Sequence, residues 1–146
     1  MEDSLHEFFT EVEKEKSINK KAEMLKERDT IGLKAILRAT FDDTIKWLIP
    51  NTTPPYEAND APDWDLADER LERAAEKLGQ FVEVGGQKTV QGQNVSQVRR
   101  EQIFIQLLEA LHPTEAKILL WSIKGKMPYK GLTKNLVNKA FPGMIA

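Results

Sequence analysis

Apolar side chains recur every three or four residues over most of the chain, which is the spacing of amphipathic helices. The first such stripe follows Ser4, and Glu7 stands three residues later, a pair typical of a capping box. The pattern predicts helices over about residues 4–15, 17–29 and 30–41. Because none of these short helices can bury its apolar face alone, we expect them to pack as an antiparallel cluster.

Two further helices are expected in the middle of the chain. The first covers about residues 41–49, where Asp42 or Asp43 would cap its start, and the second covers about residues 64–78. Trp47 lies among apolar neighbours. We therefore expect it in the core, with stacking on a base or sugar as the alternative.

The end of the chain contains several helix signals in succession. Ser96 is expected to cap one helix, and Pro113 occupies the first position of the next, where its missing amide costs nothing. Gly125 fits the left-handed position that ends this second helix, in which Trp121 is expected to join the core. Thr133 is expected to cap a short last helix. The turn between the last two helices is therefore well specified.

Two stretches lack the helical pattern. Residues 50–63 hold four of the seven prolines and are expected to form a long loop. Residues 85–95 are rich in glycine and glutamine, which predicts either a flexible surface loop or a short hairpin. The remaining pattern predicts an all-α fold, a compact single-domain bundle of about seven to eight short helices over residues 1–146.

The formal net charge is −2, but the two parts of the chain differ in sign. Residues 1–84 carry 12 Lys/Arg and 20 Asp/Glu, which gives −8, whereas residues 85–146 carry 9 and 3, which gives +6. Charges in physiological salt are screened over about 8 Å, and a domain of this length is roughly 30–40 Å across. A positive face is therefore compatible with a molecule that is acidic overall.

The positive charge gathers at the turn before the last helix. Lysines beside exposed backbone amides, at the positive end of a helix dipole, favour a bound anion such as a phosphate. An ordinary lysine-rich turn, simply solvated, is the alternative. Arg99 and Arg100 lie in the first turn of the helix after Ser96, against the dipole preference, which also hints at an anion partner. The charge pattern thus selects Lys124, Lys126, Lys130, Lys134, Arg99 and Arg100, together with Thr133 in the same turn.

Residues 131–145 resemble the segment that closes the N-terminal DNA-binding domain of ATP-dependent DNA ligases, including T4-type phage ligases. In that segment a glycine, a short helix with an Asn-Lys pair and a terminal Pro-Gly-Leu-Ile precede the catalytic domain. More loosely, residues 8–13, 20–26 and 33–41 resemble the first three helices of that domain, whereas residues 127–130 depart from its usual Arg-Asp-Leu-like sequence. The chain also resembles small uncharacterised proteins of T4-like phages, especially those that infect cyanobacteria. The positions that match the closing segment are Gly131, Asn138, Lys139, Pro142, Gly143, Met144 and Ile145.

The resemblance implies a fold similar to the ligase DNA-binding domain and a function in phage DNA replication, repair or metabolism. Ligases use that domain to grip duplex DNA through its backbone, across the minor groove and largely without sequence specificity. Carried over residue by residue, it implicates Gly131, Asn138 and Lys139, although Asn138 could also cap a helix end. The expected DNA-binding residues are therefore Lys124, Lys126, Lys130, Gly131, Thr133, Lys134, Asn138, Lys139, Arg99 and Arg100.

The sequence lacks the residues and motifs that several kinds of chemistry require. Cysteine is absent and there are only two histidines, so we expect no disulfide, no metal site and no cofactor. The sequence contains no Lys-x-Asp-Gly adenylation motif, no Walker glycine loop and no Gly-x-Ser-x-Gly. No apolar run reaches the roughly 20 residues of a membrane span, and the acidic start is unlike a signal peptide. We therefore expect a free-standing, non-catalytic binding module in the host cytoplasm, not an enzyme or a membrane protein.

The alternative function belongs to another class. The chain could be a protein-interaction or virion-associated structural protein that keeps the fold without DNA affinity. Its acidic half would then face a basic phage or host protein, with the proline-rich loop as a docking surface. A titration with DNA at two salt concentrations separates the two hypotheses, because phosphate contacts weaken steeply with salt.

Overall fold

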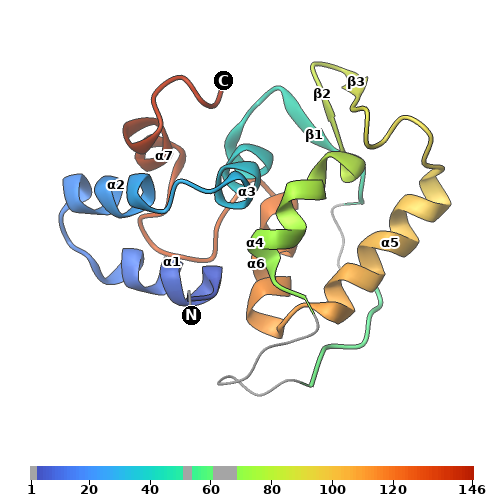
Figure 1. The fold of residues 1–146 in the computed structure, drawn as a ribbon, viewed down its shortest axis with the longest axis horizontal. Coiled ribbons are helices and arrows are strands. Elements are labelled where there is room, and N and C mark those ends of the chain that lie inside the picture. The colour runs from blue at the N-terminus through green and yellow to red at the C-terminus, as the bar shows by residue number, and fades with distance from the viewer. Residues whose placement is uncertain (1–2, 51–53, 61–68) are drawn as a thin grey trace.

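The computed structural model describes residues 3–50, 54–60 and 69–146, and Figure 1 shows how its elements are arranged. The first three helices are α1 (Leu5–Lys14), α2 (Ile18–Glu27) and α3 (Ile31–Phe41). Ser4 and Glu7 form the predicted capping box of α1. The hydroxyls of Ser17 and Thr30 accept hydrogen bonds from amides in the first turns of α2 and α3. These three helix predictions are therefore confirmed, together with their starts.

The later helices are also confirmed at their caps. They are α5 (Gln97–Ala110), α6 (Pro113–Ile123) and α7 (Lys134–Ala140). Ser96 and Thr133 accept hydrogen bonds at the starts of α5 and α7, and Pro113 opens α6. Side-chain caps satisfy the free amides of a first turn, and this local chemistry is readable from the sequence.

The all-α prediction is wrong. The described residues contain seven α-helices, one 3₁₀ helix and a three-stranded antiparallel sheet of order β1-β2-β3. The strands are β1 (Ile45–Trp47), β2 (Val82–Val84) and β3 (Gln87–Lys88). They are so short that the two-residue alternation of a strand could not be distinguished from a helical stripe in the sequence.

Strand β1 replaces the helix predicted over residues 41–49. Asp42 ends α3 instead of capping a new helix, and its carboxylate accepts hydrogen bonds from both the amide and the hydroxyl of Thr44. This turn directs the chain into β1. The indole nitrogen of Trp47 donates to the Ala39 carbonyl at 2.9 Å, and its ring meets Phe104 edge-on. Trp47 is thus half-buried and packs against the core, where the sequence placed it inside the core.

The second predicted middle helix can be followed only in part. Residues 64–68 of the predicted element lie outside the described residues, and from Leu71 the chain forms helix α4 (Leu71–Ala74), which continues directly as the 3₁₀ helix η1 (Ala75–Phe81). Gly85 and Gly86 both have positive φ and form the turn between β2 and β3. The hairpin alternative for this stretch is the one the structure adopts, and Gly-Gly suits such a turn because it lacks a Cβ atom.

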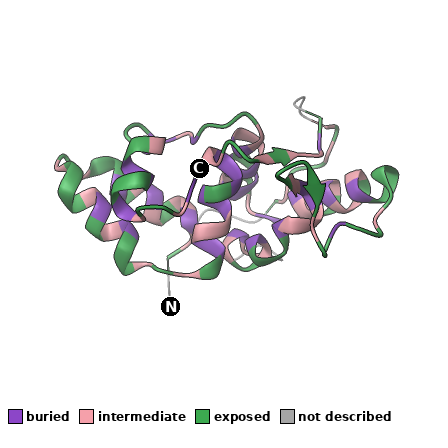
Figure 2. Cartoon of the chain, turned by 90° about the horizontal axis from the view of Figure 1, so that it is seen from above, coloured by how far each residue is buried: buried purple, intermediate pink, exposed green. Residues whose placement is uncertain are grey.

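Helix α3 is the element around which the others pack. It contacts α4, η1, α6 and β1, while α2 packs against α7 and α1 lies on α2 and α6. In Figure 1, α1, α2 and α7 lie on one side of α3, and α5 and the hairpin lie on the other. Figure 2 shows that buried positions face inward and that the outer helix faces are exposed, and in the hairpin the glycine turn and β3 are exposed.

Gly32 determines how closely α3 packs against α4. A Cβ atom added there would lie only 1.7 Å from the backbone carbonyl oxygen of Glu72. On the same side, Glu72 receives hydrogen bonds from Arg28 at 2.7 and 3.1 Å and from Thr30 at 2.6 Å. Burial alone would raise the pKa of Glu72, but these hydrogen bonds and the charge of Arg28 hold it below its usual value. Gly32 therefore allows the close contact between α3 and α4.

Candidate nucleic-acid interface

The turn after α6 has the predicted left-handed geometry. Gly125 has a φ of +76°, and its amide donates to the carbonyl of Ser122 at 2.9 Å. The amide of Lys126 donates further back, to Trp121, which closes the helix end. Lys124 and Lys126 are both exposed on either side of the glycine. The glycine thus places two ammonium groups at the end of α6.

A groove of about 430 Å³ lies beside this turn, between the ends of α3 and α6 and the start of α7. We call it the lysine groove. Lys126 and Lys134 contribute its cations, and Asp43 contributes one carboxylate. Its lining includes Phe41, Asp43, Trp121, Lys126, Thr133 and Lys134.

Lys134 and Asp43 form an ion pair in this groove. The Lys134 Nζ atom lies 2.8 Å from Asp43 Oδ2, and the two side chains are 39% and 81% exposed. Such exposed pairs contribute only about 0–1 kcal/mol to stability, so a competing anion can replace the carboxylate at little cost. Burial alone would raise the pKa of the neighbouring Asp42, but hydrogen bonds from Thr44 and Ala146 and the charge of Lys134 lower it. Asp42 therefore stays ionised beside the groove at neutral pH.

Lys130 and Gly131 do not line the groove, although Tyr129 and Leu132 on either side of them do. The amide of Lys130 donates to the carboxylate of Glu13 in α1. Gly131 has a φ of +84°, and a Cβ atom there would lie 2.5 Å from the Nζ atom of Lys21. The chain thus brings Lys21, from α2, onto this turn, while Glu13 offsets part of its positive charge. The predicted site missed Lys21 because only the packing of α2 against α7 makes them neighbours.

Helix α7 presents the remaining candidate residues. Leu136, Val137 and Ala140 are buried, which leaves Asn138 and Lys139 exposed on its outer side. The Thr133 hydroxyl accepts a hydrogen bond from Leu136 N at 3.3 Å, so it caps the helix. One amide expected to face an anion is therefore already satisfied. A helix of two turns also has few aligned peptide dipoles to offer.

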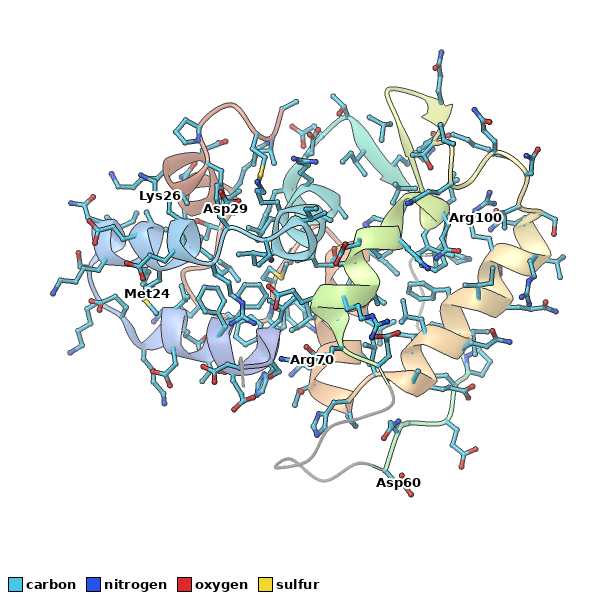
Figure 3. The ribbon with its side chains drawn as sticks, in the orientation of Figure 1. Met24, Lys26, Asp29, Asp60, Arg70 and Arg100 are labelled. Carbon is cyan, nitrogen blue, oxygen red and sulfur yellow. The ribbon has the colours of Figure 1, made fainter. Side chains whose placement is uncertain are left out.

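Arg100 is buried and stabilises the fold, and it does not contribute to a binding surface. It is 1% exposed, and its guanidinium donates to the carbonyls of Gln80, Gly92 and Val95 and to the side chain of Gln97. Figure 3 shows it between the end of η1 and the start of α5. These bonds attach the loop after the hairpin to α5, so Arg100 is not available to a phosphate. Arg99 is exposed on α5, and its side chain does not line the lysine groove.

Trp121 is the aromatic residue whose position the sequence misjudged. It was expected in the core, but it is half-buried and lines the lysine groove together with Phe41. Periodicity could not reveal this, because α6 is apolar on nearly every side and only the packing decides which side remains open. The groove therefore has an aromatic wall as well as cations.

A buried carboxylate joins three helix starts on another face of the molecule. Glu115, in the first turn of α6, is 3% exposed and accepts hydrogen bonds from the amides of Leu5 at 3.3 Å and Leu71 at 3.1 Å. These residues begin α1 and α4. Burial raises the pKa of Glu115, while the two amides and the charges of Arg70 and His112 oppose that rise. The arrangement is a double helix cap, and we assign it to stability.

The described residues contain no cluster of three or more metal-ligating side chains. None of the helices over the same ranges is both long and apolar enough to cross a membrane.

No curated protein and no solved structure matches the chain. A family model described as "Family of unknown function (DUF6433)" matches residues 8–128 and so covers most of the 146 residues, although the stretch from Lys130 to Lys139 lies beyond it. The chain therefore belongs to this family of unknown function, DUF6433.

Proposed function

We propose that this protein is a non-catalytic nucleic-acid-binding module that holds the phosphate backbone of duplex DNA. The observation that supports it best is the lysine groove, where Lys126 and Lys134 line one concave surface and Lys124 is exposed next to it. Backbone contacts of this kind position a protein on DNA without reading its sequence. The resemblance to the ligase domain, which ends in the same segment, agrees with this assignment.

The acidic remainder of the chain does not prevent such binding. Salt screens charges beyond about 8 Å, so a phosphate in the groove interacts mainly with the lysines there, with Asp43 and with the neighbouring Asp42. The net charge of −2 instead predicts that affinity is modest and that long-range attraction to DNA is weak. We expect a dissociation constant in the micromolar range or weaker, as for other non-specific binders.

A fluorescence-anisotropy titration with a labelled duplex tests the proposal. Each phosphate contact lowers log K by about 0.9 per decade of salt, so three contacts would weaken binding about 40-fold between 50 and 200 mM. Absence of binding at 50 mM salt, or binding that does not depend on salt, would exclude backbone gripping and favour the protein-interaction alternative.

Replacing Asp43 by asparagine should tighten duplex binding. The change removes a negative charge from the groove and releases Lys134 from its 2.8 Å ion pair. Two unit charges about 4 Å apart in water interact by about 1 kcal/mol, so removing the repulsion between Asp43 and a phosphate corresponds to about fivefold in affinity. The same anisotropy titration measures the effect.

Asp29→Asn is the matched control for this experiment. Asp29 is also an exposed aspartate paired with a lysine, Lys34, at 2.6 Å, but it does not line the lysine groove. Both substitutions change the net charge equally, so Asp29→Asn should leave the affinity nearly unchanged. Equal tightening by both variants would show that net charge, and not the groove, controls binding.

A second candidate function, docking of a protein partner, is favoured by a different surface. Ile31 is 69% exposed and Val84 is 45% exposed, and both line a groove of about 420 Å³ between α3, η1 and the hairpin. Exposed apolar side chains around one hollow are typical of protein contacts. If the duplex titration fails, this groove becomes the preferred place to look for a partner.

A further inference from the structure

The lysine groove combines features that duplex backbone binding does not require. Phosphate contacts need only cations and hydrogen-bond donors, whereas Trp121 and Phe41 also line this concavity of about 430 Å³. Concavities that hold small ligands have volumes of about 300–1,000 Å³, apolar or aromatic walls and a few polar groups. The groove fits that description, with Lys126, Lys134, Thr133 and Asp43 as its polar groups.

The aromatic wall is unusual for its position in the fold. Helix α6 buries Ala116, Ile118 and Leu119 in the core, yet Trp121 near its end stays half-buried and is not part of the core cluster. Trp47 is also half-buried, but its ring packs against the core, whereas Trp121 lines the groove. An aromatic side chain that lines a groove beside lysines is a combination with which proteins bind unpaired bases, because every base has a face that can stack.

We propose that the lysine groove holds an unpaired nucleobase stacked on Trp121, within a strand whose neighbouring phosphates contact Lys126 and Lys134. This inference rests on the proposed function and assigns to it a preference for single-stranded segments, such as overhangs or gaps. The strand is favoured over a free nucleotide, since Lys124 is exposed next to the groove and can contact a further phosphate.

The charges around the indole agree with this partner. Asp43 offsets one of the two groove lysines, so the groove has too little net positive charge to hold an isolated multivalent anion strongly. A base is neutral and gains its affinity from stacking, which needs aromatic surface more than charge. The phosphates then require only the exposed lysines at the rim.

The experiment compares Trp121→Leu and Trp121→Phe on labelled single-stranded oligo(dT) and on a duplex of equal length. Leucine keeps an apolar side chain without a stacking face, whereas phenylalanine keeps a smaller one. We expect Trp121→Leu to weaken oligo(dT) binding at least about fivefold, the lower end of one base–aromatic stack, and Trp121→Phe to retain most of it. Duplex affinity should stay the same in both variants. Thermal melting of each variant checks that the fold is intact.

The outcomes separate this inference from the proposed function. If the wild-type protein binds duplex but Trp121→Leu binds oligo(dT) as well as the wild type does, the base site is excluded and the backbone proposal stands. Equal losses on oligo(dT) and duplex would also exclude stacking, because only the single strand offers an unpaired base. If neither nucleic acid binds at low salt, both proposals fail. If thymidine monophosphate competed as strongly as oligo(dT) at equal molar concentration, the assignment to a strand would be overturned.

Discussion

Replacing both Lys126 and Lys134 by glutamate should weaken duplex binding at least about 100-fold at low salt. Hydrogen bonds to charged groups contribute about 1.5–3 kcal/mol each, so losing two of them removes about 3–6 kcal/mol. Two added carboxylates beside Asp43 would in addition repel phosphates. Anisotropy with the same labelled duplex measures the loss, and the salt dependence of any remaining binding should become shallower, by about 0.9 in slope for each lost contact.

The matched control is the double variant Lys77→Glu and Lys88→Glu. Both lysines are exposed, on η1 and β3, and neither lines the lysine groove. The control changes the net charge by the same amount, so it reports what bulk charge alone does. We expect less than about a threefold loss, since screening limits charge effects beyond about 8 Å. Similar losses in the two double variants would remove the groove from the candidate interface.

Gly32→Ala should be among the most destabilising single substitutions in this protein. The added Cβ atom would lie 1.7 Å from the carbonyl oxygen of Glu72, which belongs to the backbone and cannot rotate away. Helices α3 and α4 must therefore separate, which disturbs the Arg28–Glu72 hydrogen bonds and the core beneath them. Overpacking typically costs 1–3 kcal/mol and sometimes more, and we expect about 3 kcal/mol or more here. Thermal denaturation should show a midpoint roughly 10 °C lower.

Gly92→Ala provides the comparison. A Cβ atom at Gly92 would lie no closer than 3.4 Å to its nearest neighbour, the carbonyl oxygen of Gly79, which is ordinary contact distance. Gly92 is also buried, and the substitution is chemically identical, so the two variants differ mainly in the space available. We expect Gly92→Ala to change stability by less than about 1 kcal/mol. A Gly32→Ala protein as stable as the Gly92→Ala protein would mean that α3 and α4 do not meet as described.

Local chemistry made the helices predictable. Ser4, Ser17, Thr30, Ser96 and Thr133 each cap the helix that the sequence assigned to them, because a cap depends on residues only three positions apart. Gly125 and Pro113 mark a helix end and a helix start for similarly local reasons. The strands were not predictable in this way. Strand β1 exists because Val82–Val84, about forty residues away, provides its hydrogen-bond partners.

The candidate site was predictable only in part, and the reason is again distance along the chain. The lysines near Gly125 were visible as a cluster of charge, whereas Asp43 and Lys21 reach the same segment only through tertiary packing. For Arg100, in contrast, the sequence predicted a contact with an external ligand that the structure does not allow. A guanidinium near a helix start suggested an external anion, but backbone carbonyls of the neighbouring loop satisfy it inside the protein. Sequence alone does not distinguish a phosphate partner from a carbonyl partner.

The carboxylate of Glu115 has a consequence for how the chain folds. Its two hydrogen bonds connect residues that are 110 and 44 positions apart, so the first, middle and last parts of the chain meet at one buried group. Helix α1 cannot fray independently without leaving that group short of a partner. The protein should therefore unfold as one cooperative unit, and it should fold more slowly than a simple helical bundle, since contacts between distant residues must form before any of them is stable.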